Sequence, residues 1–90
     1  MRAIRAIVRG QVQGVYFRAF TRDEAGQLGV AGWVRNNPDG SVECFAQAPE
    51  DKIEAFIRFL HKGSPGARVE GVQLREETPQ PRMKGFEIRY

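Results

Sequence analysis

The first residues of the chain alternate between apolar and polar side chains. In AIRAIVR, residues 3–9, one side of an extended backbone carries Ile4, Ala6 and Val8, and two arginines lie on the other. Such alternation predicts a β-strand with one apolar face.

The period then changes to that of a helix. Between residues 16 and 28, Phe17 and Phe20 are three residues apart, and Leu28 follows Phe20 by two steps of four. This spacing predicts a helix packed by these side chains. A second helix is predicted after Pro49, which suits a helix start. Its apolar stripe has spacings of three and four residues and consists of Ile53, Phe56, Ile57 and Leu60.

Four further segments have strand patterns. They are VAGWVRN at 30–36, VECFAQA at 42–48, residues 67–76 with a bulge near Gly71, and FEIRY at 86–90. The turn residues NPDGS, at 37–41, make a hairpin of the first two. The alternation places Val34 and Asn36 on the same face of their strand.

The element order β-α-β-β-α-β, with one more strand at the end, restricts the fold. Each helix has a single apolar stripe, so both must cover one face of one sheet. With right-handed crossovers, an α+β, ferredoxin-like split β-α-β sandwich over residues 1–90 is predicted, with an antiparallel sheet of four to five strands. In this topology the carboxyl ends of the strands at 3–9 and 30–36 meet at one edge of the sheet, about 10 Å apart across the intervening strand.

Composition narrows the classes of function. Net charge is +3, and one cysteine, Cys44, excludes a disulfide framework within the chain. Cys44 is expected in the core and His61 at a helix surface. No apolar run approaches the roughly 20 residues of a membrane span, and the first ten residues lack the apolar region of a secretory signal. A cytoplasmic protein without metal or other cofactor is expected.

The stretch GQVQGVYFRAF, residues 10–20, joins the first strand to the first helix. Its glycines, Gly10 and Gly14, free the backbone so that several N–H groups can point at an anion at the helix N-terminus, where Arg18 can grip two oxygens. The alternative is a plain tight turn with a surface arginine. Across the edge, Asn36 can orient a water, or it can be an ordinary turn residue before Pro38.

These residues resemble a known family. GQVQGVYFR matches the acylphosphatase signature G-x-V-Q-G-V-x-F/Y-R, and GWVRN at 32–36, followed by NPDGSVE, is similar to the second motif of the family. SPGARV at 64–69 and the final GFEIRY extend the resemblance over nearly the whole chain.

The resemblance implies hydrolysis of the carboxyl-phosphate bond of acyl phosphates, with inorganic phosphate as a product. It implies that Arg18 binds phosphate and that Asn36 positions the attacking water. The phosphate-binding loop that it implies consists of Gln11, Val12, Gln13, Gly14, Val15, Tyr16 and Phe17.

Two alternatives accompany this prediction. The same element order serves RNA-recognition domains, but the strand at 42–48 has one aromatic residue, Phe45, and an acid, Glu43, so RNA is not expected as a partner. Acylphosphatase-like domains also occur inside larger carbamoyl-transfer proteins. A stand-alone monomeric enzyme that acts on a small molecule is the expectation, without nucleic acid or membrane.

Overall fold

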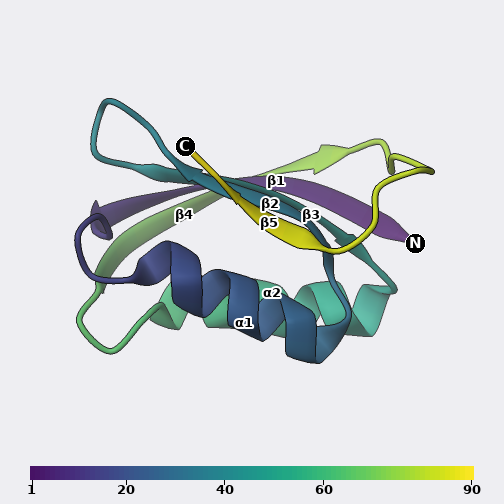
Figure 1. The fold of residues 1–90 in the computed structure, drawn as a ribbon, viewed down its shortest axis with the longest axis horizontal. Coiled ribbons are helices and arrows are strands. Elements are labelled where there is room, and N and C mark those ends of the chain that lie inside the picture. Colours follow the sequence, from purple (N-terminus) through teal and green to yellow (C-terminus); the bar gives the residue numbers. More distant parts are fainter.

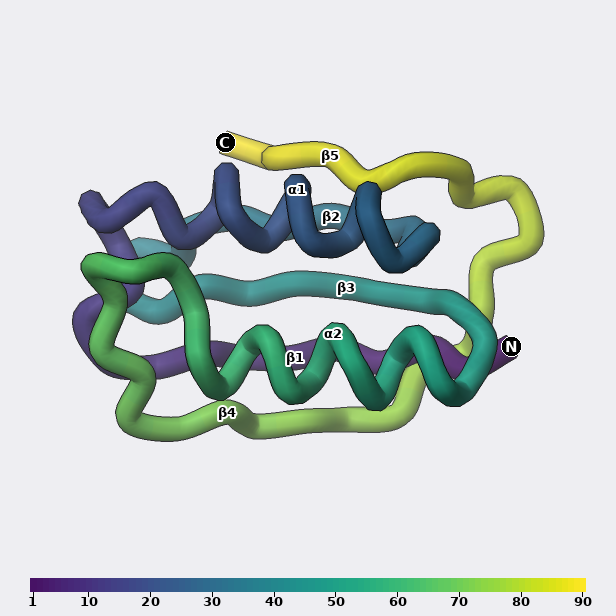
Figure 2. The backbone as a smooth tube through the Cα atoms, turned by 90° about the horizontal axis from the view of Figure 1, so that it is seen from below, coloured from purple at the N-terminus to yellow at the C-terminus, as the bar shows by residue number.

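In the computed structural model, which describes residues 1–90, a five-stranded sheet lies against two helices (Figure 1). In chain order the elements are β1 (Arg2–Gln11), α1 (Phe17–Leu28), β2 (Ala31–Asn36), β3 (Val42–Ala48), α2 (Glu50–Lys62), β4 (Arg68–Glu77) and β5 (Phe86–Arg89). Both helices cover the same face, α1 over β2 and β5 and α2 over β1 and β4 (Figure 2).

The strand order is β4-β1-β3-β2-β5. β3 pairs antiparallel with both β1 and β2, so β1 and β2 run in the same direction on either side of it. The predicted ferredoxin-like arrangement is confirmed. The predicted bulge is also present: the pairing of β1 with β4 passes from Arg9–Gly71 to Gly10–Val69.

One pair of strands departs from the predicted antiparallel sheet. β5 pairs with β2 in parallel, through partners such as Gly32–Phe86 and Val34–Ile88. Residues 78–85 carry the chain from β4, at one edge of the sheet, to the opposite edge, where β5 is added beside β2. No local pattern marks this step, because alternation along a strand is the same in parallel and antiparallel pairs.

The core lies between the sheet and the helices. Ile4, Ala6 and Val8 of β1 are fully buried there, which confirms the predicted apolar face, and the stripe of α2 packs against them. The predicted packing of α1 is partly wrong, because Phe20 is 42% exposed. The buried positions of this helix are Phe17, Thr21 and Ala25. Thr21 fits the interior because its hydroxyl donates to the Phe17 carbonyl at 2.8 Å.

The other face of the sheet carries a stack of charged side chains on an aromatic ring. Trp33 is only 6% exposed, and the guanidinium groups of Arg5, Arg35 and Arg89 lie 4.9–5.3 Å from its ring centroid. Trp33 therefore packs on this face of the sheet. Phe45 is fully buried in the same cluster, so neither ring offers an open surface on which a nucleic-acid base can stack.

The topology brings three distant segments to one end of the molecule. The loop between β1 and α1, the turn between β2 and β3, and the C-terminal end of β5 all lie there in both views (Figures 1 and 2).

Candidate active site

The loop from β1 to α1 presents unpartnered backbone donors. No hydrogen bond, to backbone or side chain, is donated by a main-chain N–H of residues 12–19. The first four N–H groups of any helix lack partners within it, and here the preceding loop adds more. Such donors need an acceptor, which water or an anion can supply.

The N-terminus of α1 lacks the usual compensation for its positive dipole. It has no side-chain cap and no acidic residue in its first turn, whereas α2 begins with Glu50 and Asp51. Its second residue, Arg18, adds another positive charge. Because acidic side chains stabilise helix N-termini and cations do not, this end of α1 favours an anion from outside the chain.

The backbone of the loop is bent by two residues in the left-handed region. Gly14 has φ 76° and Tyr16, the residue before α1, has φ 62° and ψ 22°. Alternation of this kind turns successive N–H groups toward one side. Tyr16 is a non-glycine residue in a costly conformation, and such strain is common at ligand sites.

Gly10 has a role different from the one expected. It lies inside β1 with φ 130°, and a Cβ there would collide with the Arg68 carbonyl of β4. It therefore permits the close approach of the two strands at the bulge, and the curl of the loop depends on Gly14.

Arg18 is half-buried and restrained by the end of β5. Its Nη1 donates to the carbonyl of Arg89 at 3.4 Å, and its guanidinium lies 4.8 Å from the ring centroid of Tyr90. No carboxylate contacts Arg18, so its charge is available to an anionic ligand.

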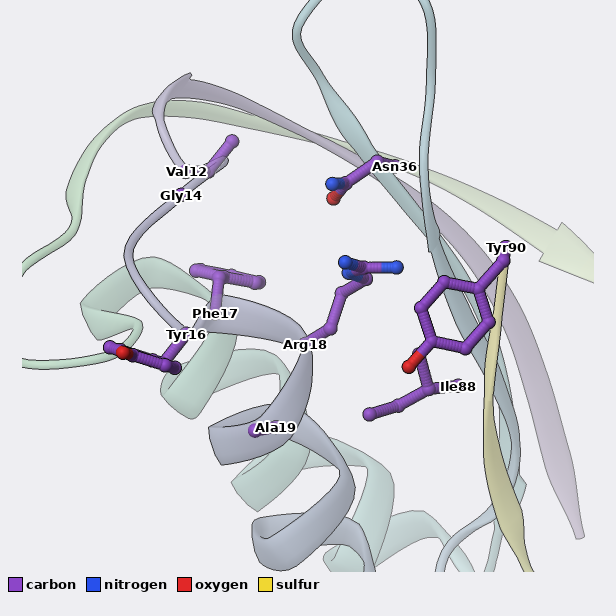
Figure 3. Close-up of a pocket in the computed structure, with 9 residues that line it drawn as sticks. All are labelled: Val12, Gly14, Tyr16, Phe17, Arg18, Ala19, Asn36, Ile88 and Tyr90. Carbon is purple, nitrogen blue, oxygen red and sulfur yellow. The ribbon is translucent and has the colours of Figure 1, made fainter.

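Asn36 is the last residue of β2 and faces the same space. Its Oδ1 is shielded from solvent and has no hydrogen-bond partner. Its amide points toward the guanidinium of Arg18 (Figure 3). An orphaned acceptor of this kind is costly unless a ligand or water donates to it.

Arg18 and Asn36 line one cavity of about 440 Å³, a size typical of small-molecule sites. The other lining residues are Val12, Gly14, Tyr16, Phe17, Ala19, Ile88 and Tyr90 (Figure 3). Of the predicted loop, Gln11 belongs to β1, where it pairs with Arg68, and the side chains of Gln13 and Val15 point elsewhere. Ile88 and Tyr90 had no local signal, because only the parallel addition of β5 brings them here.

The side chains of Gln13 and Ser64 anchor the loop. Gln13 Nε2 donates to the carbonyls of Asn37 at 2.8 Å and Ser41 at 2.9 Å. The hydroxyl of the buried Ser64 donates to the Val15 carbonyl at 2.7 Å. The loop is thus tied both to the β2–β3 turn and to the α2–β4 connection.

Other reactive side chains lie away from this cavity. Cys44 is buried in the core, where burial raises the pKa of its thiol to about 12, which confirms core packing and leaves the thiol inert. No three His, Cys, Asp or Glu residues gather as metal ligands. None of the helices has the length and apolar character to cross a membrane.

Comparison with known proteins gives a consistent result. A family model described as Acylphosphatase matches residues 4–88. A protein of Rubrobacter xylanophilus named Acylphosphatase is 48% identical over 86 residues, which are 96% of this chain and 78% of that protein.

Comparison with solved structures also finds acylphosphatase. The crystal structure of acylphosphatase from Bacillus subtilis superposes with a TM-score of 0.95 at 39% identity and covers 100% of both chains. The crystal structure of HypF from T. kodakarensis matches with a TM-score of 0.86 at 34% identity, and there this chain covers only 12% of the larger protein.

Proposed function

This chain belongs to the acylphosphatase family and is a hydrolase of acyl phosphates, and we propose that Arg18, Asn36 and the amides of the 11–17 loop carry out that reaction. The observation that carries the proposal is the meeting, around one cavity, of a guanidinium without a carboxylate partner, a row of unpartnered N–H groups and an amide oxygen without a hydrogen-bond partner.

The phosphoryl group lies between Arg18 and the loop. The guanidinium and the N–H groups donate to its equatorial oxygens, where negative charge accumulates in a loose transition state. These donors are already in place, so little reorganisation is needed when the charge develops. The leaving group is a carboxylate whose conjugate acid has a pKa of about 4, and it departs without a general acid.

The amide of Asn36 holds the attacking water. Its Oδ1 accepts one O–H of the water and so directs the oxygen lone pair at phosphorus. The new P–O bond forms as the bond to the acyl oxygen breaks, and the electron pair leaves with the carboxylate. The water proton passes to a phosphate oxygen, because an amide is not a base.

The remaining features of the proposal concern the whole chain. Residues 1–90 act as one acylphosphatase domain, as a monomer in the cytoplasm, on a small-molecule acyl phosphate and with no metal or other cofactor. The free, buried thiol of Cys44 is in keeping with a reducing compartment. Light scattering after size-exclusion chromatography tests the monomer, and a mass near 20 kDa, about twice that of one chain, would contradict it.

Hydrolysis of benzoyl phosphate in EDTA-containing buffer, with inorganic phosphate as a competitive inhibitor, tests the site. We expect Arg18→Ala to lower kcat/KM by roughly 10²- to 10³-fold and to weaken phosphate inhibition, as for loss of a transition-state donor. Asn36→Ala should lower kcat to a similar extent but keep phosphate affinity.

Arg22→Ala is the matched control, because Arg22 lies one turn along α1 and its only ion pair is with Asp23. It should behave as the parent protein does. Parent-level turnover by the Asn36 variant would exclude the role given to Asn36, and no turnover by a folded parent protein would exclude the proposed site as a whole.

A further inference from the structure

Gln13 reaches out of the phosphate loop to another element. Its Nε2 donates to the carbonyl oxygens of Asn37 and Ser41, at 2.8 and 2.9 Å. Both hydrogens of the amide group are used, and two carbonyl acceptors fix which end of the amide faces them, because only the NH₂ end can donate.

The two acceptors, the carbonyls of Asn37 and Ser41, belong to the residues that close the turn after Asn36. The Asn37 N–H donates to the Ser41 carbonyl at 2.8 Å. Asp39 Oδ1 accepts both the N–H of Ser41 at 3.0 Å and its hydroxyl at 2.6 Å, and Ser41 is buried. Gln13 therefore holds a stiff turn at a point adjacent to Asn36 in the chain.

The two halves of the proposed site come from different parts of the sheet. Arg18 and the amide loop belong to the β1–α1 connection, and Asn36 belongs to β2, with β3 between the two strands. Among residues 11–17, only Gln13 has a side chain hydrogen-bonded to the β2–β3 turn. Its two bonds are the direct tie between the groups that hold phosphate and the group that holds water.

We infer that Gln13 is a positioning residue that sets the distance and angle of the Asn36-bound water relative to the phosphate; this rests on the proposed function of the site. The reaction depends on near-attack geometry, in which a misplacement of about 1 Å can cost a hundredfold in rate. Loss of the tie leaves each half of the site intact and changes their relative position. The effect of Gln13 should therefore be on turnover and should depend on Asn36.

A double-mutant cycle on benzoyl phosphate hydrolysis tests this inference. Gln13→Ala should lower kcat about tenfold and leave the inhibition constant of inorganic phosphate within about twofold of the parent value. In the Asn36→Ala background, the same change should alter kcat by less than about twofold, because the water is no longer held. Gln13→Met keeps the length of the side chain without the donors and should show the same loss of kcat. It replaces Gln13→Ala in the cycle if the alanine variant folds poorly.

Gln27→Ala provides the control, since Gln27 is an exposed glutamine of α1 without side-chain hydrogen bonds, and it should leave kcat unchanged. Equal loss of kcat from Gln13→Ala in both backgrounds would indicate a general structural effect and overturn the inference. Parent-level kcat of both Gln13 variants would overturn it too, as would an inhibition constant that rises in step with the loss of kcat. Failure of the proposed function would be seen separately, as parent-level turnover of the single Asn36→Ala variant.

Discussion

At the scale of single residues, the N-termini of the two helices differ in charge: that of α2 is stabilised by acidic side chains, and that of α1 is not. The start of α2 has Glu50 and Asp51, which suit its dipole. The start of α1 has Arg18 and a strained Tyr16 in their place, an arrangement that costs stability until an anion binds. The β2–β3 turn next to this site has one acidic residue, Asp39, and its carboxylate holds the shape of the turn.

Asp39 is the carboxylate that makes this turn sensitive to acid. The hydroxyl and N–H of Ser41, together with Arg9, lower the pKa of Asp39 to about 2. Because the pKa in the folded state is below that of the unfolded chain, the contribution of Asp39 is fully present above about pH 3.9 and is lost as the pH falls toward 2.

We therefore expect Asp39→Ala to lower the melting temperature at pH 6, and the difference from the parent protein to shrink as the pH falls from about 4 through about 2. Thermal unfolding followed by circular dichroism at several pH values measures this. Asp23→Ala is the control, because Asp23 is exposed on α1 and its only contact is a 3.7 Å pair with Arg22. A difference between Asp39→Ala and the parent that stays constant down to pH 2 would contradict the assignment.

At the scale of elements, β5 completes the site although it lies outside the two motifs at residues 10–18 and 32–36. Its parallel pairing with β2 brings the Arg89 carbonyl and the Tyr90 ring to Arg18. The guanidinium is thereby held in place without a carboxylate, which would neutralise it. This contact explains how an arginine in the first turn of a helix can be ordered and still have its charge available.

Removal of the Tyr90 ring should loosen Arg18. An exposed cation–π contact contributes about 0.5–1 kcal/mol, so Tyr90→Ala should weaken phosphate binding about two- to fivefold. Tyr90→Phe keeps the ring and should bind phosphate as the parent protein does. Isothermal titration with inorganic phosphate checks both variants, and equal weakening in the two would show that the hydroxyl, and not the ring face, is responsible.

At the scale of the whole molecule, ligand binding and folding are coupled through the β1–α1 loop. The loop amides have no acceptor within the folded protein, so an anion can bind to them, and the unfolded chain has no such site. Phosphate should therefore stabilise the protein by mass action.

At a phosphate concentration ten times the dissociation constant, the gain is about 1.4 kcal/mol, which corresponds to a rise in melting temperature of about 6–11 °C for a domain of this size. Thermal scans at constant ionic strength, with chloride replaced by phosphate, measure the shift. Arg18→Ala should reduce it severalfold, whereas Arg22→Ala should preserve it. A shift of the same size in the Arg18 variant would place the bound phosphate elsewhere.

Much of this molecule follows from local patterns in the chain. Apolar residues at every second position identify the strands, and apolar residues three and four apart identify both helices. These periods arise because each element buries one face. Connection handedness then restricts these elements to the ferredoxin-like arrangement, which predicts that Arg18 and Asn36 end at one edge. The motif at residues 10–18 adds the family and its activity.

Other features depend on contacts between residues distant in the sequence. Phe20 has the spacing of a core residue yet is exposed, because α1 is rotated so that Thr21 faces the interior, where its hydroxyl donates to a carbonyl of the same helix. The parallel pairing of β5 with β2 joins segments that no short sequence pattern connects, and so do the two hydrogen bonds from Gln13 to the β2–β3 turn. The chain alone thus determines which groups can hold a phosphate and a water. Their relative position is decided by packing and by hydrogen bonds that exist only once the sheet has assembled.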